Sequence, residues 1–158
     1  MKRSMPRGFS VIELLVVLGL LAVLATVAMP LAQTVQQREK ERELKRALWT
    51  LRDSIDAYRR AVDELPPGSF LRTASGYPPD LQALVEGLPD VKAAGGRRLF
   101  LRALPRDPFA PSELPASRTW RLRSYASEAS RPLPGDDVYD VHSSSNVMAL
   151  NGQRVSEW

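Results

Sequence analysis

The most specific chemical pattern lies near the N-terminus, where a single carboxylate, Glu13, interrupts an apolar run. A carboxylate inside a membrane-length apolar segment is costly unless it is paired or lies near the interface. Cleavage between Gly8 and Phe9 would create a new amine four residues, or one helical turn, before Glu13. Glu13 could then neutralise that amine, either in its own chain or in a neighbouring copy. This spacing predicts a charge pair that a passive membrane anchor does not need.

Outside this segment, the sequence has no pattern typical of an enzyme. The chain has no Cys and a single histidine, His142, which excludes a Cys nucleophile, a thiolate metal site and a disulfide framework. No serine lies in a nucleophile-elbow pattern, and the chain has neither a Walker A nor a GxGxxG motif. We therefore expect a protein without catalytic activity, with His142 as a surface residue at the edge of a strand.

The element that must position Glu13 is the apolar run from Phe9 to Met29, which is 21 residues long. As a helix rising about 1.5 Å per residue, the run would span roughly 30 Å, the thickness of a bilayer core. Three basic residues precede it, and such a flank predicts a cytoplasmic N-terminus. We expect a single membrane-spanning helix with the rest of the chain on the opposite side of the membrane.

Composition alone leaves two simpler accounts of this N-terminus open. A secretory signal also has a basic start and an apolar stretch, usually of about 7–15 residues, before small residues at its cleavage site. Ala25 and Ala28 supply small residues here. A plain anchor would need only the apolar run, and neither account gives Glu13 a role. Loss of residues 1–8 would lower the net charge from +4 to +1, so the basic composition does not argue for nucleic-acid binding.

A second helical pattern extends from Leu31 to about Glu64, a stretch without Gly or Pro. Six apolar residues recur at alternating spacings of four and three, which indicates one face of an amphipathic helix. They are Leu44, Leu48, Leu51, Ile55, Tyr58 and Val62. Charged side chains occupy the other faces, and we expect most of them to be solvated. The apolar face would pack on a small domain or, alternatively, form a short coiled coil.

The C-terminal region, residues 65–158, has the pattern of a small α+β domain. Residues 65–80 are rich in Pro and Gly, which is typical of a loop. Asp80 could cap a short helix over residues 81–86, and Gly87 could end it. Short segments with apolar residues, the first of them with good alternation, then predict three strands. The expected strands span residues 120–125, 137–142 and 147–150. They would form a small antiparallel sheet against the apolar face of the helix.

The segment Gly8-Phe9-Ser10-Val11-Ile12-Glu13, with its basic leader and apolar continuation, resembles the processing site of type IV prepilins and type II secretion pseudopilins. The resemblance implies cleavage between Gly8 and Phe9 by a prepilin peptidase, N-methylation of Phe9, and a role for Glu13 in ordering assembly. Pro30 lies where many family members have a helix-kinking proline, although a helix end just past the membrane is the alternative. The implied fold is the pilin lollipop, a long helix packed on a small sheet.

Later segments resemble the major pseudopilin of type II secretion. They are Tyr77-Pro78, Leu81-Gln82-Ala83-Leu84-Val85, Leu104-Pro105-Arg106-Asp107-Pro108-Phe109, Asp137-Val138-Tyr139-Asp140 and Ser156-Glu157-Trp158. The resemblance implies a structural calcium ion in the loop after the strand that contains Asp140. Here that loop looks short and has no acid directly after Val141. Asp136, Asp137 and Asp140 could supply some of the roughly six to eight oxygen ligands that calcium prefers. The alternative is a turn that only caps the strand.

Together these observations predict an α+β, pilin-like precursor in the bacterial inner membrane. Its parts would be a leader at residues 1–8, a transmembrane and filament-core helix at 9–29, the amphipathic half of that helix at 30–64, and a periplasmic domain at 65–158. The expected function is that of a subunit of a type II secretion pseudopilus, which polymerises to export folded proteins. The expected partners are further copies of the chain, minor pseudopilins, prepilin peptidase, a platform protein, an assembly ATPase and membrane lipid, but not nucleic acid.

Two other functions stay open at this point. A type IV pilus subunit or minor pilin would serve adhesion, motility or DNA uptake, although the absence of Cys disfavours the common adhesive pilins with a C-terminal Cys pair. A membrane-anchored periplasmic binding domain would not polymerise at all. Replacement of Glu13 by Ala separates these functions, because it should abolish assembly in either filament and leave a non-polymerising domain unaffected.

Overall fold

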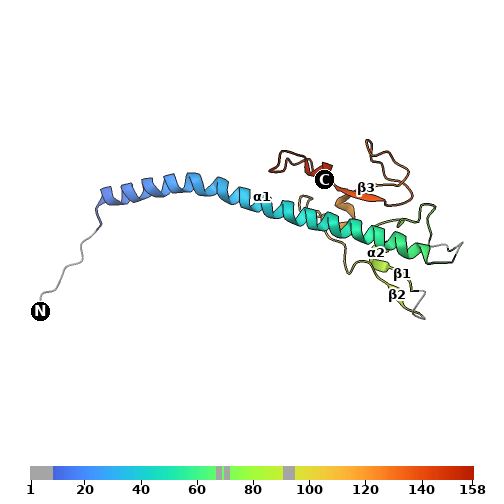
Figure 1. Cartoon of the computed structure of the whole chain (residues 1–158). Coiled ribbons are helices and arrows are strands. Elements are labelled where there is room, and N and C mark those ends of the chain that lie inside the picture. The colour runs from blue at the N-terminus through green and yellow to red at the C-terminus, as the bar shows by residue number, and fades with distance from the viewer. Residues whose placement is uncertain (1–8, 67–68, 70–71, 91–94) are drawn as a thin grey trace, which may run out of the picture. The chain divides into compact units, whose positions relative to one another are not determined.

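The computed structural model describes residues 9–66, 69, 72–90 and 95–158, with the backbone but not the side chains of residues 27–30. Its elements are α1 (Val11–Asp63), α2 (Ala83–Glu86), β1 (Leu88–Pro89), β2 (Arg97–Arg98), the 3-10 helix η1 (Ala116–Arg118), β3 (Trp120–Arg123), β4 (Asp140–Ser143) and the 3-10 helix η2 (Val155–Glu157). These elements confirm the predicted α+β class (Figure 1). By their contacts, the residues up to Arg38 and those from Glu39 onward form two separate units.

Helix α1 joins the two segments for which the sequence predicts a helix. It is 53 residues long and begins where the main-chain oxygen of Ser10 accepts hydrogen bonds from the N–H groups of Glu13 and Leu14. The absence of Gly and Pro between Leu31 and Asp63 suits this uninterrupted second half. The backbone of α1 continues through Pro30, but the side chain of Pro30 lies outside the described residues. The kink expected there stays a prediction.

The core of the second unit lies along the predicted apolar stripe of α1. All six residues of the stripe are at most 2% exposed. They pack with apolar residues from the rest of the unit, among them Leu84 of α2, Trp120 of β3 and Val141 of β4. Burial of each large aliphatic side chain contributes about 1.5–3 kcal/mol to folding. The stripe therefore anchors the domain to the helix, as its period predicts, and no coiled-coil partner is needed to bury it.

A short helix and a two-stranded sheet lie beside the C-terminal end of α1 (Figure 1). The Asp80 carboxylate accepts a hydrogen bond of 2.9 Å from the N–H of Ala83, as the predicted cap requires, but α2 begins two residues later than predicted and its N-cap residue is Gln82. Gly87 follows α2 with a φ of 71°, a conformation that suits glycine. Strands β1 and β2 then pair antiparallel, with Leu88 opposite Arg98. Here the tight approach of Gly87 to the main-chain oxygen of Arg98 leaves no room for a Cβ atom.

A second antiparallel pair, β3 with β4, forms from two of the three predicted strands. Trp120 lies opposite Ser143 and Arg123 opposite Asp140. The expected third strand at residues 147–150 is wrong, because this segment forms only an isolated bridge between Met148 and Arg154 and joins neither sheet. This short apolar segment instead leads into a tight turn, in which the N–H of Ala149 donates to the main-chain oxygen of Gln153 over 2.8 Å.

Candidate functional site

The start of α1 presents an acid without a partner. Glu13 lies in the first turn, where the positive end of the helix dipole favours a carboxylate. Its side chain is exposed, and it has no ion-pair or side-chain hydrogen-bond partner among the residues that the structure describes. Phe9, four residues earlier, precedes the helix and is 76% exposed. Gly8 lies outside the described residues, so the cleavage point between Gly8 and Phe9 stays a prediction.

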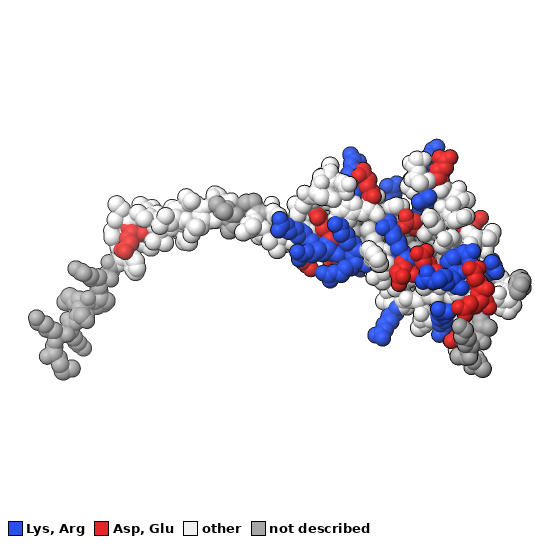
Figure 2. Space-filling model, viewed as in Figure 1, with Lys and Arg blue, Asp and Glu red and all other residues white. Residues whose placement is uncertain are grey.

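The surface that surrounds Glu13 is apolar on all sides of the helix. From Phe9 to Thr26 every side chain is exposed, and Glu13 is the only charged residue among them (Figure 2). The hydroxyl of Thr26 donates to the main-chain oxygen of Val23 over 2.7 Å, so it needs no solvent partner. Helix α1 is long and apolar enough to cross a membrane by length and composition. A helix that is apolar on every side requires lipid or other helices around it.

The acids proposed for calcium point into internal contacts of the second unit. Asp137 is buried, where one carboxylate oxygen accepts a 2.8 Å hydrogen bond from the N–H of Tyr125 and the other accepts one from Ser75 Oγ. Asp140 pairs with Arg52. Asp136 is exposed and forms no side-chain hydrogen bond or ion pair with the residues that the structure describes. The three acids are close in sequence, but the carboxylates of Asp137 and Asp140 contact different groups and do not converge on one point.

These residues do not fit a calcium site as they stand. Calcium needs several hard oxygens that converge on one point, and the described residues contain no group of three acidic, His or Cys side chains placed to hold a metal ion. The carboxylates of Asp137 and Asp140 are already bonded to donors of the chain itself. No part of the function proposed below therefore depends on a metal ion.

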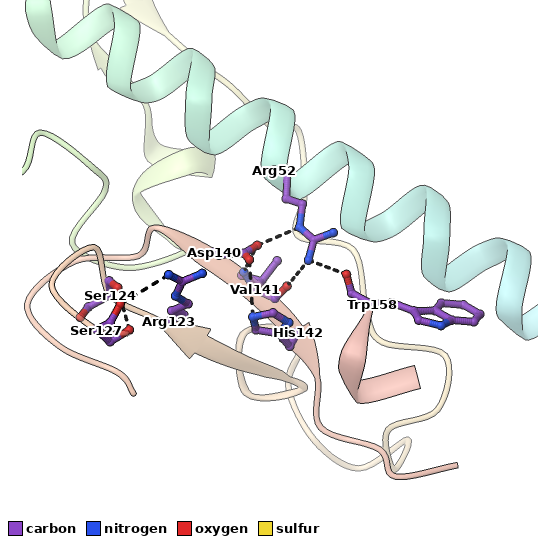
Figure 3. A network of polar contacts seen from close by, with 8 residues as sticks. All are labelled: Arg52, Arg123, Ser124, Ser127, Asp140, Val141, His142 and Trp158. Atoms are coloured by element: carbon purple, nitrogen blue, oxygen red, sulfur yellow. Dashed lines mark hydrogen bonds and ion pairs between the residues drawn. The ribbon is translucent and has the colours of Figure 1, made fainter. Parts of the chain in front are cut away.

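Arg52 connects helix α1 to this part of the domain through three hydrogen bonds. The sequence pattern predicted only a solvated charge at this position. Its Nε donates to Asp140 Oδ1 over 2.8 Å, and its Nη2 donates to the main-chain oxygens of Val141 at 3.2 Å and Trp158 at 2.8 Å (Figure 3). One guanidinium thus ties α1 to β4 and to the segment after η2. The sequence feature that could have predicted this role is the position of Arg52 beside the apolar stripe, where a long side chain can extend from the helix to the packed domain.

His142 lies next to this ion pair but is not tied to it by a hydrogen bond. Its Nε2 is 3.4 Å from Asp140 Oδ2, while both ring nitrogens are buried without a hydrogen-bond partner. Burial lowers the pKa of His142 below its ordinary 6.5, and Asp140 opposes this shift, whereas Arg52, Arg123 and Arg121 add to it. His142 lies in an edge strand as predicted, but the expectation of a surface side chain is wrong, since the ring is half-buried.

The turn that resembles the major pseudopilin motif has a structural role. Asp107 is 1% exposed, and its carboxylate accepts hydrogen bonds from Ser143 Oγ at 2.6 Å and the N–H of Phe109 at 2.8 Å. Trp120 Nε1 donates to the main-chain oxygen of Pro105 over 2.9 Å. These hydrogen bonds join the Asp-Pro segment to β3 and to the end of β4. They also give the buried Asp107 carboxylate the partners that a buried polar group needs.

The three tryptophans have three different environments. Trp120 is buried in the core, and Trp158 is partly buried with the Lys45 ammonium 4.5 Å from its ring centroid. Trp49 is 77% exposed on α1. Trp120 is therefore a core residue, whereas most of the Trp49 side chain lies on the surface of the domain.

Comparison with known proteins assigns the N-terminal segment. Residues 3–29 match the family described as Prokaryotic N-terminal methylation motif. Neither the comparison with curated proteins nor that with solved structures gave a match. The match indicates a type IV pilin-like substrate of prepilin peptidase, and it covers Gly8, Phe9 and Glu13 together with the apolar run. Proteins with this motif are structural subunits rather than enzymes.

Proposed function

We propose that this chain is a structural subunit of a type II secretion pseudopilus, in which the exposed apolar surface of α1 packs against the same helix of neighbouring copies. The single observation that carries the proposal is the unpartnered Glu13 on an apolar helix, inside a match to the methylation motif. A buried charge without a partner is costly, so Glu13 requires a cation when water is excluded. The amine of a processed Phe9 is the nearest cation that the motif supplies.

The parts of the chain have separate roles in this proposal. Residues 1–8 form a leader that prepilin peptidase removes before it methylates Phe9. Residues 9–29 hold the subunit in the inner membrane and later form the filament core, and residues 30–64 continue the helix into a periplasmic domain formed with residues 65–158. Extraction into the filament exchanges lipid contacts for helix contacts. A platform protein, minor pseudopilins and an assembly ATPase complete the machine, since the described chain holds no nucleotide-binding motif.

The choice of secretion over a surface pilus rests on residues of the second unit. The Tyr-Pro, Leu-x-x-Leu and Leu-Pro-x-Asp-Pro segments form the loop, short helix and turn that frame the core, and they resemble the major pseudopilin. The absence of Cys agrees with this choice. A deletion strain separates the two functions: loss of exoprotein export supports the proposal, whereas loss of surface fibres and motility with export intact contradicts it.

The processing step has a direct test that uses the native protein. Intact mass and N-terminal sequence of the protein from its own membrane should show loss of residues 1–8 and one added methyl group on Phe9. Replacement of Gly8 by Ala supplies a matched control, and the uncleaved form should accumulate because the peptidase site is altered. An intact Met1 in the wild-type protein, or a cut near Ala28, would contradict the proposal.

A further inference from the structure

A hollow of about 340 Å³ lies between α1 and the turn at residues 149–153. Two tryptophans line it, together with two side-chain amides and two cations. These residues are Trp49, Trp158, Asn151, Gln153, Lys45 and Arg52. The size of the hollow lies within the range of roughly 300–1,000 Å³ that small-molecule sites occupy. The proposed function gives this hollow no role, because that function rests on the N-terminal segment.

The indole of Trp49 is a free aromatic surface in this hollow. It is 77% exposed, although it lies on the folded second half of α1. Among the residues that the structure describes, it takes part in no ring pair, cation–π contact or hydrogen bond. An indole combines a broad apolar face with one N–H donor. Trp49 therefore suits a ligand that offers an apolar face and a polar edge together.

Trp158 lines the same hollow and is held in position before any ligand arrives. Arg52 Nη2 donates to its main-chain oxygen over 2.8 Å, and Figure 3 shows its indole beside α1. The Lys45 ammonium lies 4.5 Å from the centroid of its ring. These two contacts fix the partly buried side chain, so a ligand would not have to order it.

The two amides of the hollow form a fixed polar pair. Asn151 Nδ2 donates to Gln153 Oε1 over 3.1 Å, and the N–H of Gln153 donates to Asn151 Oδ1 over 3.0 Å. A primary amide carries two N–H groups. Within the described chain, this pairing leaves both amide N–H groups of the Gln153 side chain and one of Asn151 available. The pair therefore presents hydrogen-bond donors in a fixed place beside the tryptophans.

The charges around the hollow favour an uncharged ligand. The guanidinium of Arg52 already bonds the Asp140 carboxylate and two main-chain oxygens. The Lys45 ammonium already contacts the Trp158 ring. No carboxylate of the described residues lines this hollow. An anion would thus meet cations that have partners, and a cation would meet no acid, whereas a neutral group can use the free indole and the free amide donors.

We infer that this hollow binds a glycan, a chain of neutral hexose rings, with one ring stacked on Trp49 and its hydroxyls bonded to Asn151 and Gln153. A hexose ring has an apolar face of C–H groups, which suits an aromatic face. Its edge carries hydroxyls that both donate and accept hydrogen bonds, as the two amides do. A proline-rich peptide also packs on aromatic residues. Its prolines have no N–H group, so such a peptide uses less of the amide pair.

A second hollow lets the ligand continue past Trp49. Trp49 and Arg52 also line a space of about 260 Å³ together with Asp53 and Asp56, so the two hollows adjoin. Asp53 and Asp56 form no ion pair or hydrogen bond with any residue that the structure describes. Carboxylate oxygens are strong acceptors for hydroxyl groups. The adjoining hollow therefore suits a further ring of a chain better than it suits the end of a single sugar.

Two sources could supply this ligand chemistry, the glycan of the cell wall and a free saccharide. The cell-wall source rests on the proposed function, because a periplasmic domain would lie beside that glycan. The site itself does not rest on it. All of its lining residues belong to the second unit, which begins at Glu39 and is separate from the apolar segment around Glu13.

Binding to defined saccharides tests the inference with the full chain in a detergent that has no sugar headgroup. Titration calorimetry measures the affinity for cellotetraose, for the tetramer of N-acetylglucosamine, and for a proline-rich and a lysine-rich peptide. We expect saturable binding of a tetrasaccharide that ~0.5 M salt does not weaken, since no ion pair forms. Sedimentation with isolated cell-wall sacculi measures binding to the natural polymer.

Three variants locate the binding site. Trp49→Ala should lower the affinity about tenfold, because the stacking surface is lost. Trp49→Phe should retain most of it, and Gln153→Ala should lower it while leaving the indole in place. Tyr125→Ala removes another exposed aromatic side chain outside the hollow and should have no effect. Because Trp49 is exposed, its variants should fold, and equal melting temperatures check this.

The outcomes separate the two sources and the two proposals. Binding to sacculi and to the N-acetylglucosamine tetramer supports the site with the cell wall as its source, whereas binding to cellotetraose without sacculi supports the site with a free saccharide. Absence of saccharide binding, binding that Trp49→Ala does not weaken, or binding of either peptide in place of the saccharides overturns the inference. A chain that binds saccharide but is neither processed nor assembled contradicts the proposed function and leaves the site standing.

Discussion

Arg52 of α1 and Asp140 of β4 form an ion pair with a distance of 2.8 Å between Nε and Oδ1, although 88 residues separate them in the chain. The same guanidinium donates to main-chain oxygens of Val141 and Trp158. Arginine suits this position because its planar group can bond several acceptors at once. The contact joins helix α1 to the rest of the domain by a polar link in addition to the apolar core.

Replacement of Arg52 by Ala should lower the free energy of unfolding by about 1–3 kcal/mol, because it leaves the half-buried Asp140 carboxylate without its cation. Arg52→Lys should restore part of the loss, since an ammonium keeps the charge but cannot reach three acceptors. Urea unfolding of the full chain in detergent measures both values. Arg121→Ala, at an exposed position of β3, is the control, and a loss equal to that of Arg52→Ala would contradict the link.

Stability should decrease as the pH falls below about 6.5 because of His142. Burial lowers the pKa of His142 in the folded protein below 6.5, so the unfolded chain takes up the proton first. Neutral His142 therefore contributes its full stabilising effect above its pKa in the unfolded chain. This effect is lost as the pH falls toward the lower pKa of His142 in the folded protein. Unfolding free energies at several pH values between 7.5 and 5.5 test this, with ~0.1 M salt held constant. The variant His142→Gln should show a smaller slope, and an equal slope would exclude His142 as the cause.

Replacement of Leu51 by Ala should destabilise the domain by about 2–5 kcal/mol, because a fully buried side chain leaves a cavity in the core. Leu51 is 0% exposed. Thermal unfolding of the full chain measures the effect. Thr50→Ala, at the neighbouring exposed position, is the matched control and should change the melting temperature little. Similar values for the two variants would mean that the apolar stripe does not anchor the domain.

Replacement of Glu13 by Gln should abolish filament formation and leave cleavage before Phe9 intact. The amide cannot neutralise an N-terminal amine in a water-excluded core, so the attraction between subunits is lost. Sedimentation of filaments and the mass of the membrane-bound protein give the two readouts. Glu43→Gln, on the exposed surface of the second half of α1, controls for the lost charge. Filaments of normal yield from the Glu13 variant would contradict the role of this carboxylate.

Removal of calcium should leave the melting temperature unchanged. The carboxylates of Asp137 and Asp140 already accept hydrogen bonds from donors of the chain itself, so they do not need a metal ion as a partner. Melting of the full chain with a chelator, with added calcium and with added magnesium tests this expectation. A rise that calcium produces and magnesium does not would show that the acids rearrange around the ion. Asp136→Asn and Asp140→Asn would then show which acid binds it.

Local patterns were sufficient wherever a residue's role depends on its neighbours in sequence. The apolar run, the stripe from Leu44 to Val62 and the cap at Asp80 were all predictable, because helical period and capping act within a few residues. The matched methylation motif is likewise a continuous segment, and it includes Glu13. The α+β class follows from these elements together with the strand patterns at β3 and β4.

The tertiary structure alone decided the partners of the polar residues and the extent of the sheet. Residues 147–150 form a short apolar run like that of a strand, but a strand exists only where its main-chain groups pair with a neighbouring strand, and this segment joins neither sheet. Asp140 lies in the strand before a loop that resembles a calcium site, yet Arg52 reaches its carboxylate from another element. Such choices depend on which groups the folded chain brings together over long sequence distances, and no local pattern contains that information. The sequence by itself therefore determined the helix and the processing signal, and the packed domain determined how its charges are used.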